Sequence, residues 1–174
     1  MNTPPGKKTG HAFEAYPNAP PTWSGYDEKN MHDPDAVDNR NVWLVKFAPF
    51  RTPWENIVQR GTFTLRGVRN LAARKHLTSM RIGDEVLYYH SQKELAVVGL
   101  MQVSREAYPD PTSADPQWLT CDFTPLRSLP RPVRLAELKA DSRFTTLALL
   151  NQPRLAVMPV AYEHFKIIVE EMGL

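Results

Sequence analysis

The chain has 174 residues and a net charge of +2, with 42% hydrophobic and 23% charged residues. These values are ordinary for a globular protein with a real core, and they exclude a chain that is disordered throughout. No apolar run approaches the ~20 residues of a membrane span, and the amino-terminal stretch lacks the apolar segment of a secretory signal. The single cysteine, Cys121, excludes an internal disulfide and a cysteine-cluster zinc site, and it favours a reducing, cytoplasmic compartment.

Residues 1–40 differ in composition from the rest of the chain. They hold six of the 16 prolines, carry a net charge of −2 and show no sustained apolar periodicity. We interpret them as an extended, proline-rich tail. The sequence therefore predicts one domain over residues 41–174, which carries a net charge of +4.

Short strands and short helices alternate irregularly along that domain. Apolar and β-branched runs predict strands at residues 42–47, 62–65, 85–90, 96–104 and 118–126. Helical spacing predicts helices at residues 52–58 (with Thr52 as N-cap), 70–80, 135–140 and 162–172. The loop Ser91–Glu94 predicts a hairpin between the third and fourth strands. This pattern is typical of an α+β domain around a small barrel.

The segment between Glu55 and Asp84 contains no acid but six basic residues. Within it, Arg66-Gly67-Val68-Arg69-Asn70 opens the predicted helix 70–80. A helix N-terminus offers unpaired N–H groups, and Gly67 permits close backbone approach, so this corner suits a phosphate. The alternative is a simple Asn70 N-cap beside solvated arginines.

Aromatic and proline-rich stretches offer further candidates. Alternation in the strand that ends at Tyr88-Tyr89-His90-Ser91 places Tyr88 and His90 on one face and Tyr89 on the other. These groups suit base recognition, although strand tyrosines are more often core residues. Tyr108 precedes a loop stiffened by Pro109 and Pro111.

Catalytic and metal signals are weak. The five histidines show no ligand spacing, and the sequence contains no P-loop, GxGxxG or GxSxG motif. Cys121 lies in a predicted strand, which favours a buried, inert thiol. The sequence therefore predicts no metal, no cofactor and no enzymatic activity.

Several stretches in a fixed order resemble the EVE domain family of the PUA-like superfamily. They cover residues 42–172 and are Trp43-Leu44-Val45-Lys46 with Pro49, Gly67-Val68-Arg69-Asn70 with Ala73-Arg74, Gly83-Asp84, Tyr89-His90-Ser91, Arg105 to Thr112, Leu129 to Val133 with Leu135 to Lys139, and Arg154-Leu155 with Pro159-Val160. The resemblance implies a PUA-like β-barrel flanked by short helices, similar to YTH and ASCH domains. It also implies a reader of modified bases such as modified cytosines in DNA. In bacterial members the domain occurs alone or fused to nucleases, so a bacterial protein without cutting activity is expected.

The sequence departs from the family pattern at two places. The first-strand motif Lys-Ser-Glu-Pro is Lys46-Phe47-Ala48-Pro49 here, and the tryptophan two residues before Gly67 is Leu65. The serine, the acid and one aromatic ring expected around a base are therefore missing. Loss of one stacking platform costs ~1–3 kcal/mol per base.

These observations lead to one hypothesis and two alternatives. The hypothesis is a non-catalytic module that binds nucleic acid, modified DNA in preference to RNA, and holds a modified base in a barrel pocket. The first alternative is a small hydrolase of modified nucleosides, for which Lys46 and His90 are the candidates for a nucleophile or general base, and the second is an interaction module with a degenerate pocket. No membrane partner is expected, and the oligomeric state is left open. The expected ligand-binding residues are Lys46, Phe47, Arg66, Gly67, Val68, Arg69, Asn70, Arg74, Tyr89, His90, Ser91 and Tyr108.

Overall fold

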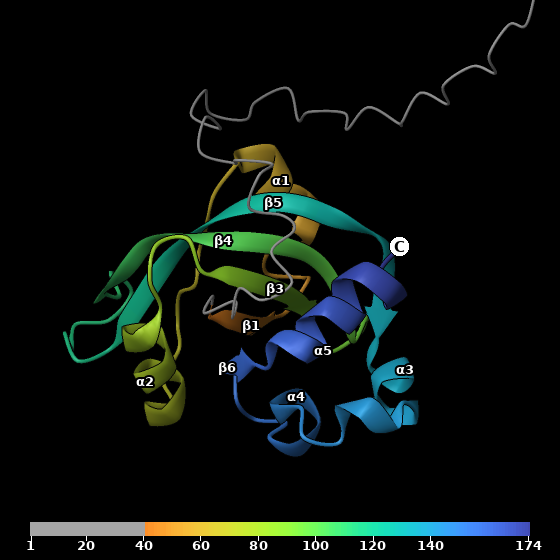
Figure 1. Cartoon of the computed structure of the whole chain (residues 1–174). Coiled ribbons are helices and arrows are strands. Elements are labelled where there is room, and N and C mark those ends of the chain that lie inside the picture. Colours follow the sequence, from red (N-terminus) through yellow and green to blue (C-terminus); the bar gives the residue numbers. More distant parts are fainter. Residues whose placement is uncertain (1–40) are drawn as a thin grey trace, which may run out of the picture. The chain divides into compact units, whose positions relative to one another are not determined.

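The computed structural model describes residues 41–174, and the predicted tail at residues 1–40 lies outside this range. The strands are β1 (Val42–Phe47), β2 (Phe63–Thr64), β3 (Glu85–His90), β4 (Ala96–Pro109), β5 (Leu119–Arg134) and β6 (Val157–Val160). The helices are α1 (Trp54–Arg60), α2 (Leu71–Ser79), α3 (Leu135–Ala140), η2 (Ser142–Phe144), α4 (Ala148–Asn151), α5 (Tyr162–Lys166) and the π-helix η3 (Ile167–Met172). Figure 1 shows their arrangement.

The six described strands form one mixed sheet in the order β2-β5-β4-β3-β1-β6. Only β1 and β3 run parallel among them, and the long segment between these two strands contains α1, β2 and α2. The α+β class is therefore confirmed. The predicted barrel is not, because β2 and β6 end the sheet and are not paired with each other.

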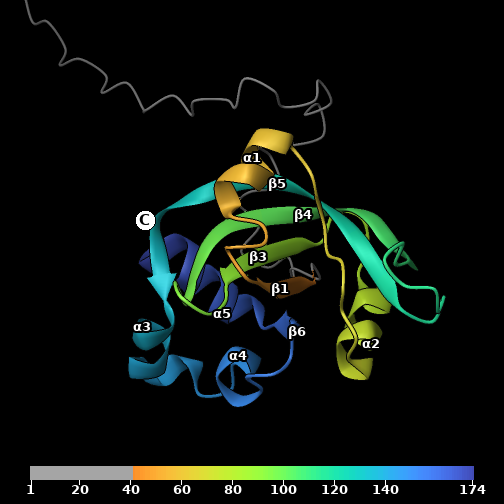
Figure 2. The same ribbon diagram turned by 180° about the vertical axis from the view of Figure 1, so that it is seen from behind.

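The long hairpin of β4 and β5 gives the sheet its curvature. The pairing between these strands changes register at four places, and each such irregularity bends and twists the strands locally. As a result the hairpin curls away from β3 at the end near α2 (Figures 1 and 2). Both strands exceed their predicted length. Residues 105–109 extend β4 and pair with residues 119–122, and residues 127–134 extend β5 and pair with residues 96–100.

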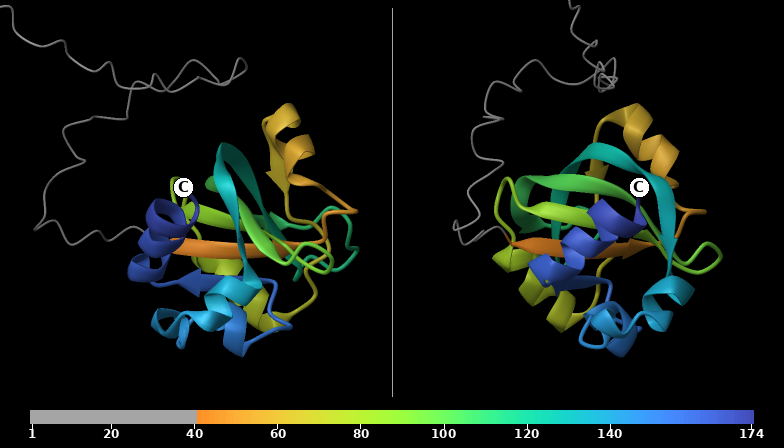
Figure 3. Two further views of the ribbon diagram at one scale, coloured as in Figure 1. Left: turned by 90° about the vertical axis from the view of Figure 1, so that its right-hand side faces the viewer. Right: turned by 45° about the vertical axis from the view of Figure 1, so that its right-hand side comes forward.

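Helices cover both faces of the sheet. Figure 3 shows α1 on one side of the strands and α5 on the other. On the α1 side, Trp54 packs against Tyr88 with ring centroids 5.6 Å apart, and its indole Nε1 donates to Ser128 Oγ at 2.8 Å. The predicted cap of this helix is wrong, because Pro53 is the N-cap, without a side-chain bond, and Thr52 instead uses its carbonyl to accept from Tyr88.

The predicted helix at residues 162–172 is present but is not uniform. It begins as α5 and continues as η3, in which the backbone winds as a π-helix. The predicted hairpin between β3 and β4 and the predicted helix α3 are confirmed. Among residues 41–174 no helix is long and apolar enough to cross a membrane.

Gly99 of β4 generates a test of this packing. A Cβ built on Gly99 would lie 2.2 Å from Trp54 Cζ2, closer than two carbon atoms can approach. We expect Gly99→Ala to lower the free energy of unfolding by ~1–3 kcal/mol, measured by urea denaturation. Ser104→Ala at an exposed position of the same strand is the control and should change little.

A double variant sharpens this test. If the indole is the obstacle, Gly99→Ala should cost less when Trp54 is already Leu, since residues in contact are not additive. Equal costs of Gly99→Ala in both backgrounds would show that Trp54 does not limit this position.

Candidate nucleic-acid interface

The turn before α2 is built as its sequence predicts. Asn70 is the N-cap, and its Oδ1 accepts from the backbone N–H of Ala73 at 3.0 Å. Gly67 has φ = 83°, a left-handed conformation that glycine adopts without strain. Val68 is buried and anchors the turn, while Arg66 and Asn70 are exposed. The predicted turn Arg66–Asn70 at the N-terminus of α2 therefore lies at the surface.

An internal carboxylate occupies the inner side of this turn. Asp110 Oδ2 accepts from Gly67 N at 2.9 Å and from Arg69 Nη1 at 2.8 Å, and its Oδ1 accepts from the Thr112 N–H and hydroxyl at 2.8 and 2.7 Å. The side chain of Asp110 is fully buried. Burial would raise the pKa of Asp110, but the bonds from Arg69, Thr112 and Gly67 outweigh burial and hold that pKa well below its ordinary value. Asp110 therefore stays ionised.

Asp110 reduces the number of hydrogen-bond donors that the turn before α2 can present to a ligand. The Gly67 N–H and one edge of the Arg69 guanidinium are already used inside the protein. Arg69 Nη2 also donates to Thr112 Oγ1 at 3.3 Å, and the side chain, held in this orientation, keeps 36% of its surface exposed. The sequence did not reveal Asp110 as the partner, because it lies 41 residues away.

Trp118 holds two arginines at this edge. The guanidinium of Arg69 lies 5.9 Å from the Trp118 ring centroid and that of Arg74 lies 5.7 Å from it. Arg74 Nη1 also donates to the carbonyl and the side-chain oxygen of Gln117, at 3.4 and 3.1 Å. Sequence analysis missed Trp118, because its position in an expected strand indicated a core residue.

The ends of β1 and β3 form a second group of predicted residues. The ring of Phe47 is half-buried and packs edge-on against Phe63 with centroids 5.3 Å apart. Tyr88 contacts both Phe63 and His90, so its ring lies on the same face of the sheet as the Phe47 ring. Ser91 donates its backbone N–H to Phe47 O at 2.9 Å and ties the two strand ends together.

His90 is engaged on both ring nitrogens. Its Nε2 accepts from the backbone N–H of Trp54 at 3.1 Å, which leaves Nδ1 to contact the Glu94 carboxylate. Because Nε2 accepts, the ring proton of the neutral form is on Nδ1. His90 is also only 2% exposed. This histidine fixes the start of α1 against β3.

Lys46 and Tyr89 lie on the other face of the sheet by strand alternation. Lys46 Nζ donates to the carbonyl of Pro153 at 2.5 Å, and burial lowers the pKa of this amine. Tyr89 is 1% exposed, and burial raises its pKa to about 12. Lys46 and His90, the two candidates of the hydrolase alternative, therefore lie on opposite faces of the sheet, and each is hydrogen-bonded within the fold.

Tyr108 is also used within the fold. Its hydroxyl donates to Asp122 Oδ1 at 2.7 Å, and the Arg105 guanidinium lies 3.7 Å from its ring centroid. Burial raises the pKa of Tyr108, and the bond to Asp122 raises it further. The phenol therefore links β4 to β5.

Arg51 joins the two groups of predicted residues. Its guanidinium lies 4.9 Å from the Phe47 ring centroid, and its Nη2 lies 3.9 Å from where a Cβ of Gly67 would stand. Gly67 therefore has Arg51 on one side and Asp110 on the other. Arg51 could not be identified from the sequence. It follows Phe47 by four residues, but this spacing predicts a side-chain contact only within a helix, and Phe47 ends a strand.

Two surface depressions lie beside these groups. The larger, of about 600 Å³, lies between α2 and the β4–β5 connection, and Arg74 is the one predicted site residue that lines it. The smaller, of about 270 Å³, is lined by Pro49, Phe50, Pro53 and Gln92 to Glu94. No cluster of potential metal ligands occurs within residues 41–174.

Residues 41–171 match the sequence model of the EVE domain family. The chain belongs to this family. It is 33% identical to mouse (Mus musculus) thymocyte nuclear protein 1 over 168 residues, which cover 74% of this chain and 72% of that protein. It is 32% identical to the human protein over 126 residues, which cover 59% of this chain and 56% of that protein. The EVE domain chain thus spans about half to three quarters of these curated relatives.

Solved structures with the same fold carry the comparison further. A protein of Rhodopseudomonas palustris is 40% identical, with a TM-score of 0.71 over 76% of this chain and 92% of that one. Human thymocyte nuclear protein 1 in complex with 5-methylcytosine-containing DNA is 29% identical, with a TM-score of 0.68 over 75% of this chain and 96% of that one. A YTH domain of Zygosaccharomyces rouxii, 12% identical with a TM-score of 0.51 over 80% of this chain and 89% of that one, shows the shared fold alone.

The Asp110 contacts predict a pH-dependent contribution to stability. We expect Asp110→Asn to cost ~3 kcal/mol at pH 7, because an amide replaces a buried, paired carboxylate. The folded-state pKa of Asp110 is lowered, so its contribution is complete above the ordinary value of 3.8 and declines as the pH falls below it. The difference between wild type and variant, measured by urea denaturation, should therefore narrow between pH 5 and about pH 2.5.

Asp115→Asn serves as the matched control. Asp115 is an exposed aspartate of the same hairpin connection, and an Asn side chain can still accept from the backbone N–H of Gln117, so its replacement should change stability little. Equal losses for both variants, or a pH-independent loss for Asp110→Asn, would contradict the role given to Asp110.

Proposed function

We propose that this EVE domain is a non-catalytic module that binds nucleic acid and reads a modified base, with DNA preferred over RNA. The observation that carries the proposal is its likeness to the human protein solved with 5-methylcytosine-containing DNA, which it matches over 96% of that chain. The exposed or half-buried cations near the turn before α2 support it, since phosphates attract such a cluster. These cations are Arg66, Arg69, Arg74 and Lys75.

The proposed position of the base is the face of the Phe47 ring. This ring is supported from its edge by Phe63, and its face is covered by the exposed side chain of Arg51. A guanidinium is flat and stacks on rings as bases do. A base that has left the duplex takes the place of the Arg51 guanidinium on Phe47, and Arg51 is then free to pair with a phosphate.

The open backbone of Gly67 borders the same place. A side chain at residue 67 would approach the Arg51 guanidinium, whereas glycine leaves room for a ligand against the turn. Leu65, which stands where the family pattern has an aromatic ring, is only 1% exposed and cannot stack on a base. In this proposal the ring of Phe47 takes over that role. One open ring therefore carries base stacking in this proposal.

The interaction-module alternative has one observation in its favour. Leu65 is buried and Phe47 packs on Phe63, so apolar side chains fill part of the space where the family pattern has a ring and a serine. In that alternative the chain discriminates no base and Arg51 stays on Phe47. The same binding experiment separates the two functions.

We expect the wild-type chain to bind a duplex with 5-methylcytosine more tightly than the unmodified duplex, and more tightly than RNA of the same sequence. Phe47→Leu keeps an apolar contact with Phe63 but removes the ring face, so the preference for the modified duplex should fall about tenfold, toward one. Affinity for the unmodified duplex should change little. Fluorescence anisotropy titrations at fixed salt measure both ratios.

Phe50→Leu is the matched control, because Phe50 is 74% exposed and lies close in sequence but carries no ring contact in the described structure. It should leave the preference intact. Absence of binding to all three oligonucleotides would reject the proposal. Binding without any preference in the wild type would support the interaction-module alternative over base reading.

A further inference from the structure

The depression between α2 and the β4–β5 connection has the composition of a phosphate-binding groove. We call it the α2 groove. Its lining residues are Leu71, Arg74, Lys75 and Thr78 of α2 with Pro116, Gln117 and Leu119 opposite. Among residues 41–174, two cations and no acid line this volume of about 600 Å³. Figure 2 shows α2 beside the curled end of β4 and β5 that forms the other wall.

The arginines at the groove are held in place before any ligand binds. The Trp118 ring lies against the Arg69 and Arg74 guanidiniums, at 5.9 and 5.7 Å from its centroid. Arg69 is also fixed by Asp110, and Arg74 by Gln117. A long side chain that is already ordered loses less entropy on binding, so each such cation contributes more affinity than a mobile one.

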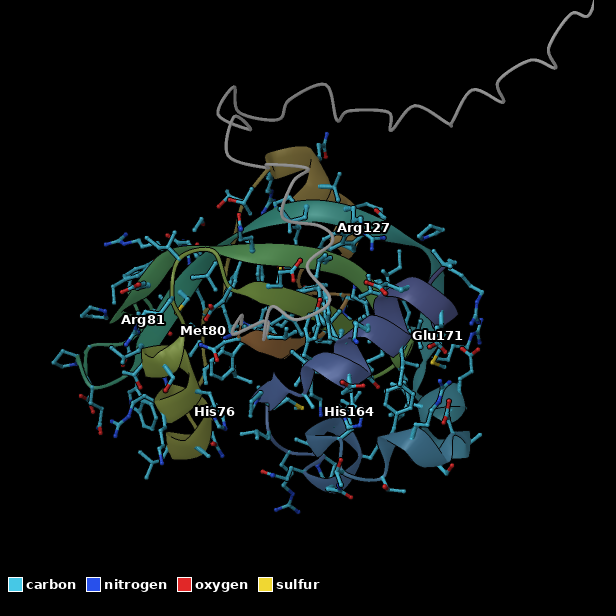
Figure 4. The ribbon with its side chains drawn as sticks, viewed as in Figure 1. His76, Met80, Arg81, Arg127, His164 and Glu171 are labelled. Carbon is cyan, nitrogen blue, oxygen red and sulfur yellow. The ribbon has the colours of Figure 1, made fainter. Side chains whose placement is uncertain are left out.

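The charge balance around the groove remains positive. Asp115 is the nearest acid on the rim, and hydrogen bonds from Gln117 to its carboxylate lower its pKa, with nearby Arg74 adding to this effect. Asp110 is buried and satisfied by Arg69. Lys75 is exposed. Arg81 extends the positive region beyond the end of α2, on the side of the molecule away from Glu171 (Figure 4).

We propose that the α2 groove binds the sugar–phosphate backbone of the strand that flanks the read base. This inference rests on the proposed function and adds a second, sequence-independent contact region to it. The two regions are linked through Arg69. Asp110 joins Arg69 to Gly67, which borders Arg51 over Phe47, and Trp118 joins Arg69 to Arg74 of the groove. Phosphates bind Arg74 and Lys75, and the sugar edges lie along the apolar wall of Leu71 and Leu119.

The proposal predicts a uniform loss of affinity when groove cations are removed. Arg74→Ala and Lys75→Ala should weaken binding of modified and unmodified duplexes by the same factor, so the preference ratio stays at the wild-type value. Each lost phosphate contact lowers the log–log salt slope by about 0.9. The affinity deficit of each variant should therefore be about threefold larger at 50 mM than at 200 mM salt.

Trp118 provides a second and different readout. Trp118→Leu keeps every charge but removes the ring that orders the arginines, so affinity should fall while the salt slope stays close to that of the wild type. Trp118→Phe should restore part of the loss. Lys139→Ala, an exposed cation of α3 outside the groove, is the charge control and should change neither affinity nor slope. Far-ultraviolet circular dichroism and thermal melting verify that each variant is folded.

The outcomes separate this inference from the proposed function. If the wild type discriminates the modified duplex but Arg74→Ala and Lys75→Ala leave affinity and salt slope unchanged, the groove proposal is wrong and base reading stands. If these variants alter the preference ratio instead, the groove reads bases and the backbone role is wrong. If polyglutamate displaces DNA as well as an oligonucleotide of equal charge does, the groove is a site for acidic peptides. If no oligonucleotide binds to the wild type, both proposals fall.

Discussion

The candidate interface depends on one buried carboxylate. Asp110 at the end of β4 accepts hydrogen bonds from Gly67, Arg69 and Thr112, and an ionised group without such partners would be far too costly to bury. These bonds fasten the tip of the β4–β5 hairpin to the turn that starts α2. Trp118 follows in the same hairpin, so this connection also positions the ring that Arg69 and Arg74 contact.

The same carboxylate lowers the charge that a ligand meets. The sequence between Glu55 and Asp84 suggests a local excess of six positive charges. In the fold, Asp110 forms an ion pair with Arg69, and Asp115 lies close enough to Arg74 and Arg69 to offset part of their charge. What remains for a polyanion is a smaller set of oriented cations. Oriented cations attract a distant polyanion less strongly than six unpaired charges would, but they contact phosphates at fixed positions. This arrangement favours one defined position of a nucleic-acid backbone on the protein over non-specific binding.

Local patterns predicted the elements but not the contacts between them. The sequence was sufficient for β1, for β3 and for α2 with its Asn70 cap, because apolar alternation and capping act over a few residues. It underestimated β4 and β5, because residues 105–109 and 127–134 form strand only through pairing with residues 119–122 and 96–100 of the opposite strand. It also grouped Lys46 with Phe47, although neighbours in a strand face opposite sides of the sheet. Arg51 and Asp110 enter the site through tertiary packing alone.

In the proposed binding mode, the Phe47 ring supplies stacking energy for a base, although the first-strand motif has lost its serine and its acid. Cation–π stacking of an exposed arginine contributes ~0.5–1 kcal/mol, whereas stacking of a base on an aromatic ring contributes ~1–3 kcal/mol. In the proposed binding mode, exchange of the Arg51 guanidinium for a base is therefore favourable at the ring. The displaced cation would gain a phosphate partner as well, so the two steps would reinforce each other. A buried apolar residue packed on Phe47 could not be displaced in this way. Arg51 is exposed and charged, so its flat guanidinium can leave the ring for solvent or a phosphate, and a flat base can take its place.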